Sequence, residues 1–235
     1  MSATILVVEH EANCPPGHVG RWLEAAGATL DVCRPYAGDA LPASLAHCDG
    51  LLVLGGSMGA NDDAEHAWLR PLKQLIRTTT RPVLGICLGH QLVAAAYGGE
   101  VDLNPRGQQL GLLEVGWTSE AAGDPLLGSL ATPRRGIQWN DDIVTTLPPG
   151  AVVLAATTAG EPQAVRFAPR AWGVQLHPEA DEEIVGVWAV SDEDRHLAQG
   201  VDQAELLRQF KEARPELDRA WRPLADAFVE LAATP

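Results

Sequence analysis

Two short segments of the sequence hold residues that could carry out nucleophilic catalysis. In the first, residues 85–91 (GICLGHQ), Cys87 has one glycine two residues before it and another two residues after it. An apolar run leads into Cys87 and a helix-forming run leaves it, which is typical of a nucleophile elbow, a sharp turn from strand to helix. The elbow would hold the thiol at the tip of a strand, and the adjacent helix N-terminus would favour the thiolate.

A base for this thiol is expected in the second segment, residues 175–179 (QLHPE). Pro178 stiffens the end of an apolar run, so that His177 and Glu179 would project from one fixed loop. In such an arrangement Cys87 attacks a carbonyl carbon, His177 takes and returns the proton, and Glu179 orients the imidazole and supports its charged form. The residues by themselves predict a cysteine hydrolase without naming its substrate.

The two motifs, in this order and at this spacing, resemble those of the class I (triad) glutamine amidotransferase family. The resemblance runs from about Ile5 to Glu179 and covers most of the chain. It implies a catalytic triad of Cys87, His177 and Glu179. It also implies a substrate class, the side-chain amide of glutamine, which is cleaved to glutamate and ammonia through a γ-glutamyl thioester.

A glycine cluster at residues 55–59 (GGSMG) fits the same chemistry. A thioester route passes through a tetrahedral oxyanion, which needs preorganised N–H donors. The resemblance places one donor at the backbone amide of Gly56 and the other at the amide of Leu88, and Gly55 is expected to contact the substrate. Taken alone, the cluster also fits a flexible turn. A phosphate-binding loop fits the cluster less well, because such loops have a lysine after the glycines and none follows here.

Two interpretations are open for each of Gln91 and His90, which lie close to Cys87 in the sequence. Gln91 lies one helical turn further on and could face the same cavity, where the resemblance implies contact with the glutamine substrate. The alternative is a solvent-facing helix residue. His90 competes with His177 as the base, but we expect its ring to pack under the turn.

The segment from Trp139 to Asp142 departs from the family pattern. Many relatives have histidine-glycine-aspartate where this chain has Asn140-Asp141-Asp142, and they often have glutamate at the position of Gln109. We expect Trp139 and Asn140 to contact the substrate, although Asn140 could instead cap its own backbone. The exchange leaves open a γ-glutamyl peptide or amide hydrolase with the same triad.

A third hypothesis is a non-catalytic glutamine-binding or regulatory subunit of a synthetase. The intact triad argues against it. The chain contains no Ser-Gly-Gly-x-Asp-Ser pyrophosphatase loop, so an ammonia acceptor would be a separate synthetase subunit.

Composition excludes some functions. The net charge is −14, and no stripe of basic residues suggests nucleic-acid binding. No apolar run approaches the ~20 residues that span a bilayer.

Four widely spaced cysteines and the lack of a visible signal peptide favour a reducing cytoplasm. We predict neither a metal nor another cofactor, because His10, His18, His47, His66 and His196 lack metal-ligand spacing and are expected on the surface. Cys33 and Cys48 are expected to be buried.

Apolar runs alternate with helical patterns in the first half of the chain. Strands are expected at 5–8, 29–33, 51–54 and 83–86, and helices at 20–26, 64–78 and 88–97. This alternation predicts an α/β fold with a flavodoxin-like, mostly parallel central sheet flanked by helices. Short runs at 110–117, 135–139, 152–156, 164–167 and 171–176 predict an added, smaller antiparallel layer. Helices follow at 181–190, 203–213 and 216–232. We assign residues 1–179 to the amidotransferase domain and 180–235 to a C-terminal helical extension packed on it.

Overall fold

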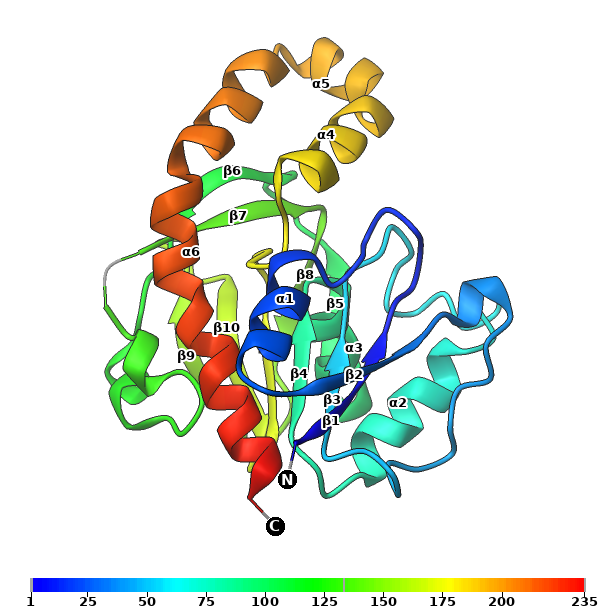
Figure 1. Ribbon diagram of the computed structural model, residues 1–235. Coiled ribbons are helices and arrows are strands. Elements are labelled where there is room, and N and C mark those ends of the chain that lie inside the picture. The colour runs from blue at the N-terminus through cyan, green and yellow to red at the C-terminus, as the bar shows by residue number, and fades with distance from the viewer. Residues whose placement is uncertain (1, 133, 235) are drawn as a thin grey trace.

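A seven-stranded sheet with helices on both faces forms the centre of the fold (Figure 1). The computed structural model describes residues 2–132 and 134–234. The strand order is β2-β1-β3-β4-β11-β10-β9. The first five of these strands run parallel, and the last two alternate in direction. In sheet order the strands are Thr29–Cys33, Thr4–Val8, Gly50–Val53, Val83–Ile86, Ala171–Val174, Pro162–Ala168 and Val152–Ala156.

The two faces of this sheet pack against different helices. Alternate strand residues point to opposite faces, so that Ile5 and Leu84 belong to one hydrophobic cluster while Leu6 and Val83 belong to the other. The first cluster lies against α1 and α6, and the second against α2 and α3. The helices are α1 (Gly17–Ala25), α2 (Leu69–Thr78), α3 (Leu88–Ala96), α4 (Glu182–Ser191), α5 (Glu193–Gln199) and α6 (Gln203–Ala233).

Two small antiparallel sheets lie beside the central one. One pairs β5 (Glu100–Leu103) with β8 (Asp142–Thr146), and the other pairs β6 (Gln109–Glu114) with β7 (Arg135–Asn140). Short 3₁₀ turns occur at Pro35–Ala37, Ser119–Gly123 and Gly128–Leu130. The predicted fold class is confirmed: a mostly parallel, flavodoxin-like sheet flanked by helices, with smaller antiparallel sheets added.

The predicted extent of the antiparallel layer was wrong. Only the runs that became β6 and β7 form a separate sheet, whereas β9, β10 and β11 extend the central one. Strand β11 pairs parallel with β4, with Val174 opposite Ile86. All four residues of β11 are buried, as is usual for a parallel strand covered on both faces.

The helical predictions also needed correction. The two helices expected at 203–213 and 216–232 form one 31-residue helix, α6, which contains Pro215 and Pro223. Each proline removes one backbone hydrogen bond, but the helix continues because it buries a row of large apolar side chains. These are Leu206, Phe210, Leu217, Trp221, Leu224 and Phe228. Helix α2 starts at Leu69 rather than at residue 64, and α5 was not predicted.

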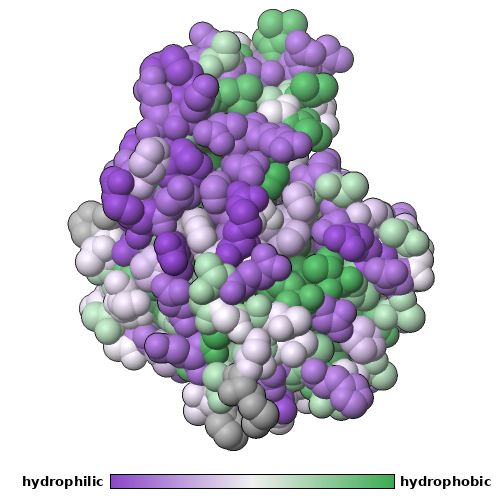
Figure 2. Space-filling model, in the orientation of Figure 1, coloured by the Kyte–Doolittle hydropathy of each residue, from purple (hydrophilic) through white to green (hydrophobic). Residues whose placement is uncertain are grey.

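Helices α4 and α5 lie at one end of the molecule, and α6 runs from there to the other end (Figure 1). Figure 2 shows hydrophobic residues interspersed with hydrophilic ones at this α4–α5 end and mainly hydrophilic ones along α6. The exposed side chains there include Val187, Val190 and Leu197. No helix in the described part of the chain is both long and apolar enough to cross a membrane.

Candidate active site

Cys87 lies at the sharp turn between β4 and α3. Its backbone has φ 52° and ψ −108°, and it is the only non-glycine residue with a positive φ in residues 2–132 and 134–234. A side chain in this region is strained, and strain of this kind is concentrated at functional sites. The Cys87 N–H donates to the Val174 carbonyl at 2.9 Å, which ties the turn to the end of β11.

The flanking glycines are required by close backbone contacts. A Cβ atom on Gly85 would lie 2.3 Å from the carbonyl oxygen of Gly89, and one on Gly89 would lie 2.0 Å from the oxygen of Val53. Both distances are far below van der Waals contact. A larger residue would not fit at either position, and the two glycines allow the turn to be this tight.

His177 and Glu179 follow the end of β11, beside Cys87. His177 Nδ1 lies 2.6 Å from Glu179 Oε1, and the backbone N–H of His177 donates to the Ile137 carbonyl at 2.8 Å. The loop is also fixed from the other side, because the His18 N–H at the start of α1 donates to the Glu179 carbonyl at 2.8 Å. The two side chains are buried, with His177 3% and Glu179 1% exposed.

The electrostatic surroundings favour a charged imidazole. Burial by itself lowers the pKa of His177, but the adjacent Cys87 and Glu179 side chains raise it by more. The net result is a pKa well above the ordinary value of 6.5. His177 Nε2 has no hydrogen-bond partner among the described residues. An imidazole in this setting can hold a proton taken from the thiol.

Cys87 and His177 share the wall of a cavity of about 520 Å³. Gly55 lies directly against both, since a Cβ at that position would be 3.3 Å from His177 Cε1 and 3.7 Å from Cys87 Cβ. The other residues expected at the site that line the cavity are Gly56, Gln91, Trp139 and Asn140. Leu88 is almost completely buried behind this wall.

The two expected oxyanion donors are neighbours. A Cβ on Gly56 would be 2.9 Å from Leu88 Cδ2. Neither the Gly56 nor the Leu88 backbone N–H donates a hydrogen bond to another described residue. Neither N–H group therefore has a competing backbone partner among the described residues.

Gln91 belongs to the cavity wall, and the solvent-facing alternative was wrong, since the residue is 3% exposed. Its Nε2 donates to the Asp142 carbonyl at 3.0 Å and to Gln175 Oε1 at 3.3 Å. These bonds leave the Gln91 side-chain oxygen free to accept from a ligand.

Asn140 shows features of both interpretations offered for it. It lines the cavity, but its Nδ2 also donates to the carbonyl of Asp142, two residues on, at 3.0 Å. The same Nδ2 donates to Gln109 Oε1 at 3.2 Å, and Gln109 in turn donates to Glu161 at 2.7 Å. Asn140 Oδ1 is buried without a hydrogen-bond partner in the described residues.

Sequence reasoning missed the wall that α4 supplies. Trp188, Ser191 and Asp192 line the cavity, and the Trp188 ring centroid is 4.6 Å from that of His177. Asp192 Oδ2 accepts a hydrogen bond from Trp139 Nε1 at 2.8 Å. The sequence did contain a signal for this wall. A helix was predicted directly after the His-Pro-Glu motif, and such a helix must begin next to the cavity.

The histidines outside the site differ from expectation in two cases. His10 and His196 are completely buried, although both were predicted at the surface. His10 Nδ1 accepts from Trp68 Nε1 at 3.0 Å, and His196 lies among polar side chains between α5 and α6. His90 is buried as expected and packs on Phe167 at 5.1 Å between ring centroids. No group of three His, Cys, Asp or Glu side chains in the described residues is placed to hold a metal ion.

The fold is an α/β architecture in which Cys87, His177 and Glu179 lie together at one edge of a mostly parallel sheet. The model of the glutamine amidotransferase class-I family matches residues 19–187, and the chain belongs to this family.

Three relatives place the chain within a diverse group. It is 31% identical over 200 residues to the glutamine amidotransferase-like protein YfeJ of Salmonella typhimurium, covering 82% of this chain and 83% of YfeJ. It is 32% identical over 154 residues to one subunit of the glutamine-hydrolyzing GMP synthase of Halobacterium salinarum, covering 65% and 76% of the two chains. It is 31% identical over 144 residues to gamma-glutamyl peptidase 5 of Arabidopsis thaliana, covering 58% and 56%.

Solved structures share the whole architecture. A glutamine amidotransferase from Thermotoga maritima superposes with a TM-score of 0.86 at 24% identity, covering 98% of this chain and 99% of that one. A glutamine amido transferase from Methylobacillus flagellatus has a TM-score of 0.84 at 28% identity, covering 98% and 95%. The similarity therefore includes α4, α5 and α6.

Proposed function

We propose that this protein hydrolyses the side-chain amide of glutamine to glutamate and ammonia, with Cys87 as nucleophile, His177 as base and Glu179 as the group that orients it. The observation that carries the proposal is the convergence of these side chains. Cys87 at a strained elbow shares one cavity wall with a buried imidazole, which is hydrogen-bonded to a buried carboxylate at 2.6 Å. Membership of the glutamine amidotransferase class-I family supports the substrate class.

The proposed reaction has two halves. In the first, Cys87 Sγ bonds to the amide carbon while His177 holds the proton of the thiol. The carbonyl oxygen becomes an oxyanion that accepts from the N–H groups of Gly56 and Leu88. The carbon–nitrogen bond then breaks, His177 gives the proton to the departing nitrogen, and ammonia leaves a γ-glutamyl thioester.

In the second half, water attacks the thioester and gives a proton to His177. The carbon–sulfur bond breaks, the proton returns to the sulfur, and glutamate is released. The raised pKa of His177 supports the first half, because an imidazole that holds its proton firmly stabilises the thiolate beside it.

The use of the ammonia is a separate question. The Halobacterium relative is, by its name, one subunit of a glutamine-hydrolyzing GMP synthase. We infer by analogy that a separate synthetase subunit is one candidate acceptor for this chain. In that case the isolated protein is expected to be slow, because the residue 55–59 loop would complete the oxyanion site only when the synthetase docks.

A second candidate substrate is a γ-glutamyl peptide or substituted amide. Asn140 favours it, since this neutral side chain lines the cavity at a position where many relatives have histidine. The similarity to a plant gamma-glutamyl peptidase supports it as well. The triad would act in the same way, with an amine or amino acid leaving in place of ammonia.

The decisive assay measures glutamate and ammonia release from glutamine and from a panel of γ-glutamyl amides and peptides. Wild type is expected to turn over at least one of them, and Cys87→Ser none. If wild type hydrolyses none of these compounds, calorimetry measures whether wild type and Cys87→Ser bind glutamine. Binding without hydrolysis would identify a glutamine-binding protein and contradict the proposed catalysis. Equal release by wild type and Cys87→Ser would overturn the proposal.

A further inference from the structure

The indole of Trp188 on α4 covers the imidazole of His177. Their ring centroids are 4.6 Å apart, and the ring planes are inclined by 57°. Trp188 is 7% exposed, and its Nε1 donates to the backbone carbonyl of Asn13 at 2.9 Å. The indole is therefore held at both ends, by the ring contact and by a hydrogen bond to a different part of the chain.

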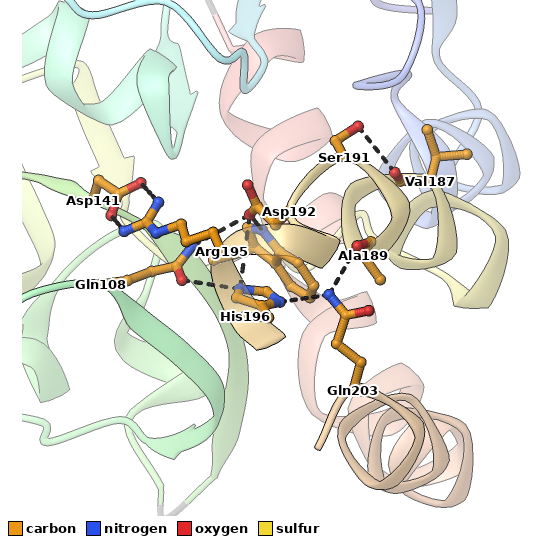
Figure 3. A network of polar contacts seen from close by, with 10 residues as sticks. Gln108, Asp141, Val187, Ala189, Ser191, Asp192, Arg195, His196 and Gln203 are labelled. Carbon is orange, nitrogen blue, oxygen red and sulfur yellow. Dashed lines mark hydrogen bonds and ion pairs between the residues drawn. The ribbon is translucent and has the colours of Figure 1, made fainter. Parts of the chain in front are cut away.

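The α4–α5 pair that carries Trp188 is itself anchored by polar contacts (Figure 3). At the junction of the two helices, Asp192 accepts from Trp139 at 2.8 Å. One turn into α5, Arg195 forms a two-pronged ion pair with Asp141, with Nη1 2.6 Å from Oδ2. These contacts bind both helices to the β7–β8 side of the cavity.

The buried ring of His196 supplies the third anchor. Its Nε2 lies 3.1 Å from Gln108 Oε1, and its Nδ1 lies 2.7 Å from Gln203 Nε2 at the start of α6 (Figure 3). A buried polar group satisfied on both sides rigidifies its surroundings. Helices α4 and α5 are thus fixed relative to the loops that form the cavity, and so is Trp188.

We propose that Trp188 is a positioning residue for His177, which fixes the plane of the imidazole and excludes water from its interaction with Cys87 and Glu179. The inference rests on the proposed function of His177 as base. Trp188 lies just past residue 187, where the family-model match ends. The segment that follows the His-Pro-Glu motif therefore contributes to the geometry of the proposed base.

The physical effect of Trp188 is electrostatic as well as steric. Water screens charges strongly, whereas a dry environment strengthens the attraction between a thiolate and an imidazolium. Removing the indole admits water to the ring of His177. The thiolate of Cys87 is then less stabilised and forms only at higher pH.

The test compares Trp188→Leu and Trp188→Phe with wild type, and Val190→Ala serves as the control on the same helix. Val190 is 74% exposed and does not line the cavity. The first readout is the rate of Cys87 alkylation by iodoacetamide as a function of pH, and the second is kcat and KM on the best substrate found. Thermal unfolding is followed for every variant.

Trp188→Leu is expected to move the acid limb of the alkylation profile upward by about 0.5–1 pH unit and to lower kcat by about tenfold or more, with a smaller change in KM. Trp188→Phe is expected to keep most of the wild-type kcat and a nearly wild-type alkylation profile, because it retains an aromatic ring. Val190→Ala behaves as wild type. If Trp188→Leu does not fold, Trp188→Met takes its place, because it also removes the ring but fills more of the space; the same upward shift is expected.

An alkylation profile of the folded Trp188→Leu variant, or of its substitute Trp188→Met, that superimposes on wild type overturns the proposal, even if stability falls. A Trp188→Phe profile no closer to wild type than that of Trp188→Leu does the same. Alkylation needs no substrate, so this result is independent of whether the proposed glutamine hydrolysis is found.

Discussion

The N–H of Cys87 donates to the carbonyl of Val174, which connects the strand ending at the proposed nucleophile to the strand ending at the proposed base. Because β4 and β11 run parallel and adjacent, both chains leave the sheet at the same edge. Cys87 is the first residue after β4, and His177 is the third after β11. Sheet pairing alone therefore brings together two residues that are far apart in the sequence.

Cys87 is expected to be the cysteine that reacts first with iodoacetamide or a glutamine-like electrophile at pH 7. Burial, and to a lesser extent nearby carboxylates, raises the pKa of the Cys14, Cys33 and Cys48 side chains above the ordinary value. These three therefore remain thiols at pH 7. Mass spectrometry of peptides should find Cys87 labelled at least about tenfold faster. Cys87→Ser is the control, and faster labelling of any other cysteine would exclude the assignment.

His177→Ala is expected to lower turnover by about 10²–10⁴-fold while leaving the fold intact. Glu179→Ala should cost less, because the orienting carboxylate is the triad member whose loss is usually least damaging. Steady-state kinetics of both variants at matched pH decide the order. If Glu179→Ala proved the slower enzyme, the roles given to the two residues would have to be exchanged or abandoned.

Gly85→Ala should destabilise the protein, because the new Cβ would lie 2.3 Å from the Gly89 carbonyl oxygen. Relieving this overlap requires a backbone shift, which costs about 1–3 kcal/mol. Gly186 on α4 is the matched control, since a Cβ there meets nothing within 4 Å. Gly186→Ala should instead raise the unfolding free energy by up to about 1 kcal/mol, through helix propensity. Urea unfolding measures both, and equal midpoints would contradict the close packing of the elbow.

Acidification between pH 6.5 and 4 should weaken the fold through two buried histidines. Burial, together with His66 in the case of His10, lowers the pKa of His10 and His90 from 6.5 to about 4. In this range the unfolded chain binds protons that the folded chain does not. The free energy of unfolding therefore falls as pH falls, by about 1.4 kcal/mol per pH unit for each histidine.

His10→Gln tests this pH dependence, because glutamine can still accept the hydrogen bond from Trp68. The unfolding free energy of His10→Gln, measured in urea at several pH values, should change less steeply than that of wild type. His47→Gln, at an exposed position, is the control and should follow wild type. A His10→Gln slope as steep as that of wild type would refute the assignment.

Asn140→His should shift substrate preference toward free glutamine without disturbing the triad. Asn140 Nδ2 donates to Gln109 and Asp142, and Oδ1 is buried without a partner among the described residues, so the side chain is held in the cavity wall. A histidine would crowd the wall where a substituent on the γ-amide would lie. The ratio of kcat/KM for glutamine to that for a γ-glutamyl peptide should rise about tenfold. An unchanged ratio would favour a purely backbone-capping role for Asn140.

Features encoded by neighbouring residues could be predicted from the sequence. The elbow depends on Gly85 and Gly89 beside Cys87, and the pattern of alternating strands and helices is visible in single runs. Strand pairing is different, because nothing in residues 171–174 specifies β4 as the partner. The burial of His196 depends on Gln108, which lies 88 residues earlier in the sequence, and on Gln203 at the start of the next helix, so its surroundings could not be inferred.

Helix α6 showed a further limit of local reasoning. Two helices were expected, at 203–213 and 216–232, but the apolar contacts of one 31-residue helix outweighed the interruptions at Pro215 and Pro223. The contribution of Trp188 was missed for a related reason. A tryptophan on a helix is usually a core residue, and only the short distance between Trp188 and His177 distinguishes Trp188 from an ordinary core tryptophan.

Helix α6 also joins the two ends of the molecule. It begins at the α4–α5 end and ends next to the start of β1, where a Cβ on Gly50 would lie 2.9 Å from Ile5 and 3.4 Å from Phe228. A helix of this length spans about 45 Å. The start of β1 and the last turns of α6 therefore lie together at the end of the molecule opposite α4 and α5 (Figure 1). One continuous helix thus connects the segment that carries the Trp188 contact with the opposite edge of the central sheet.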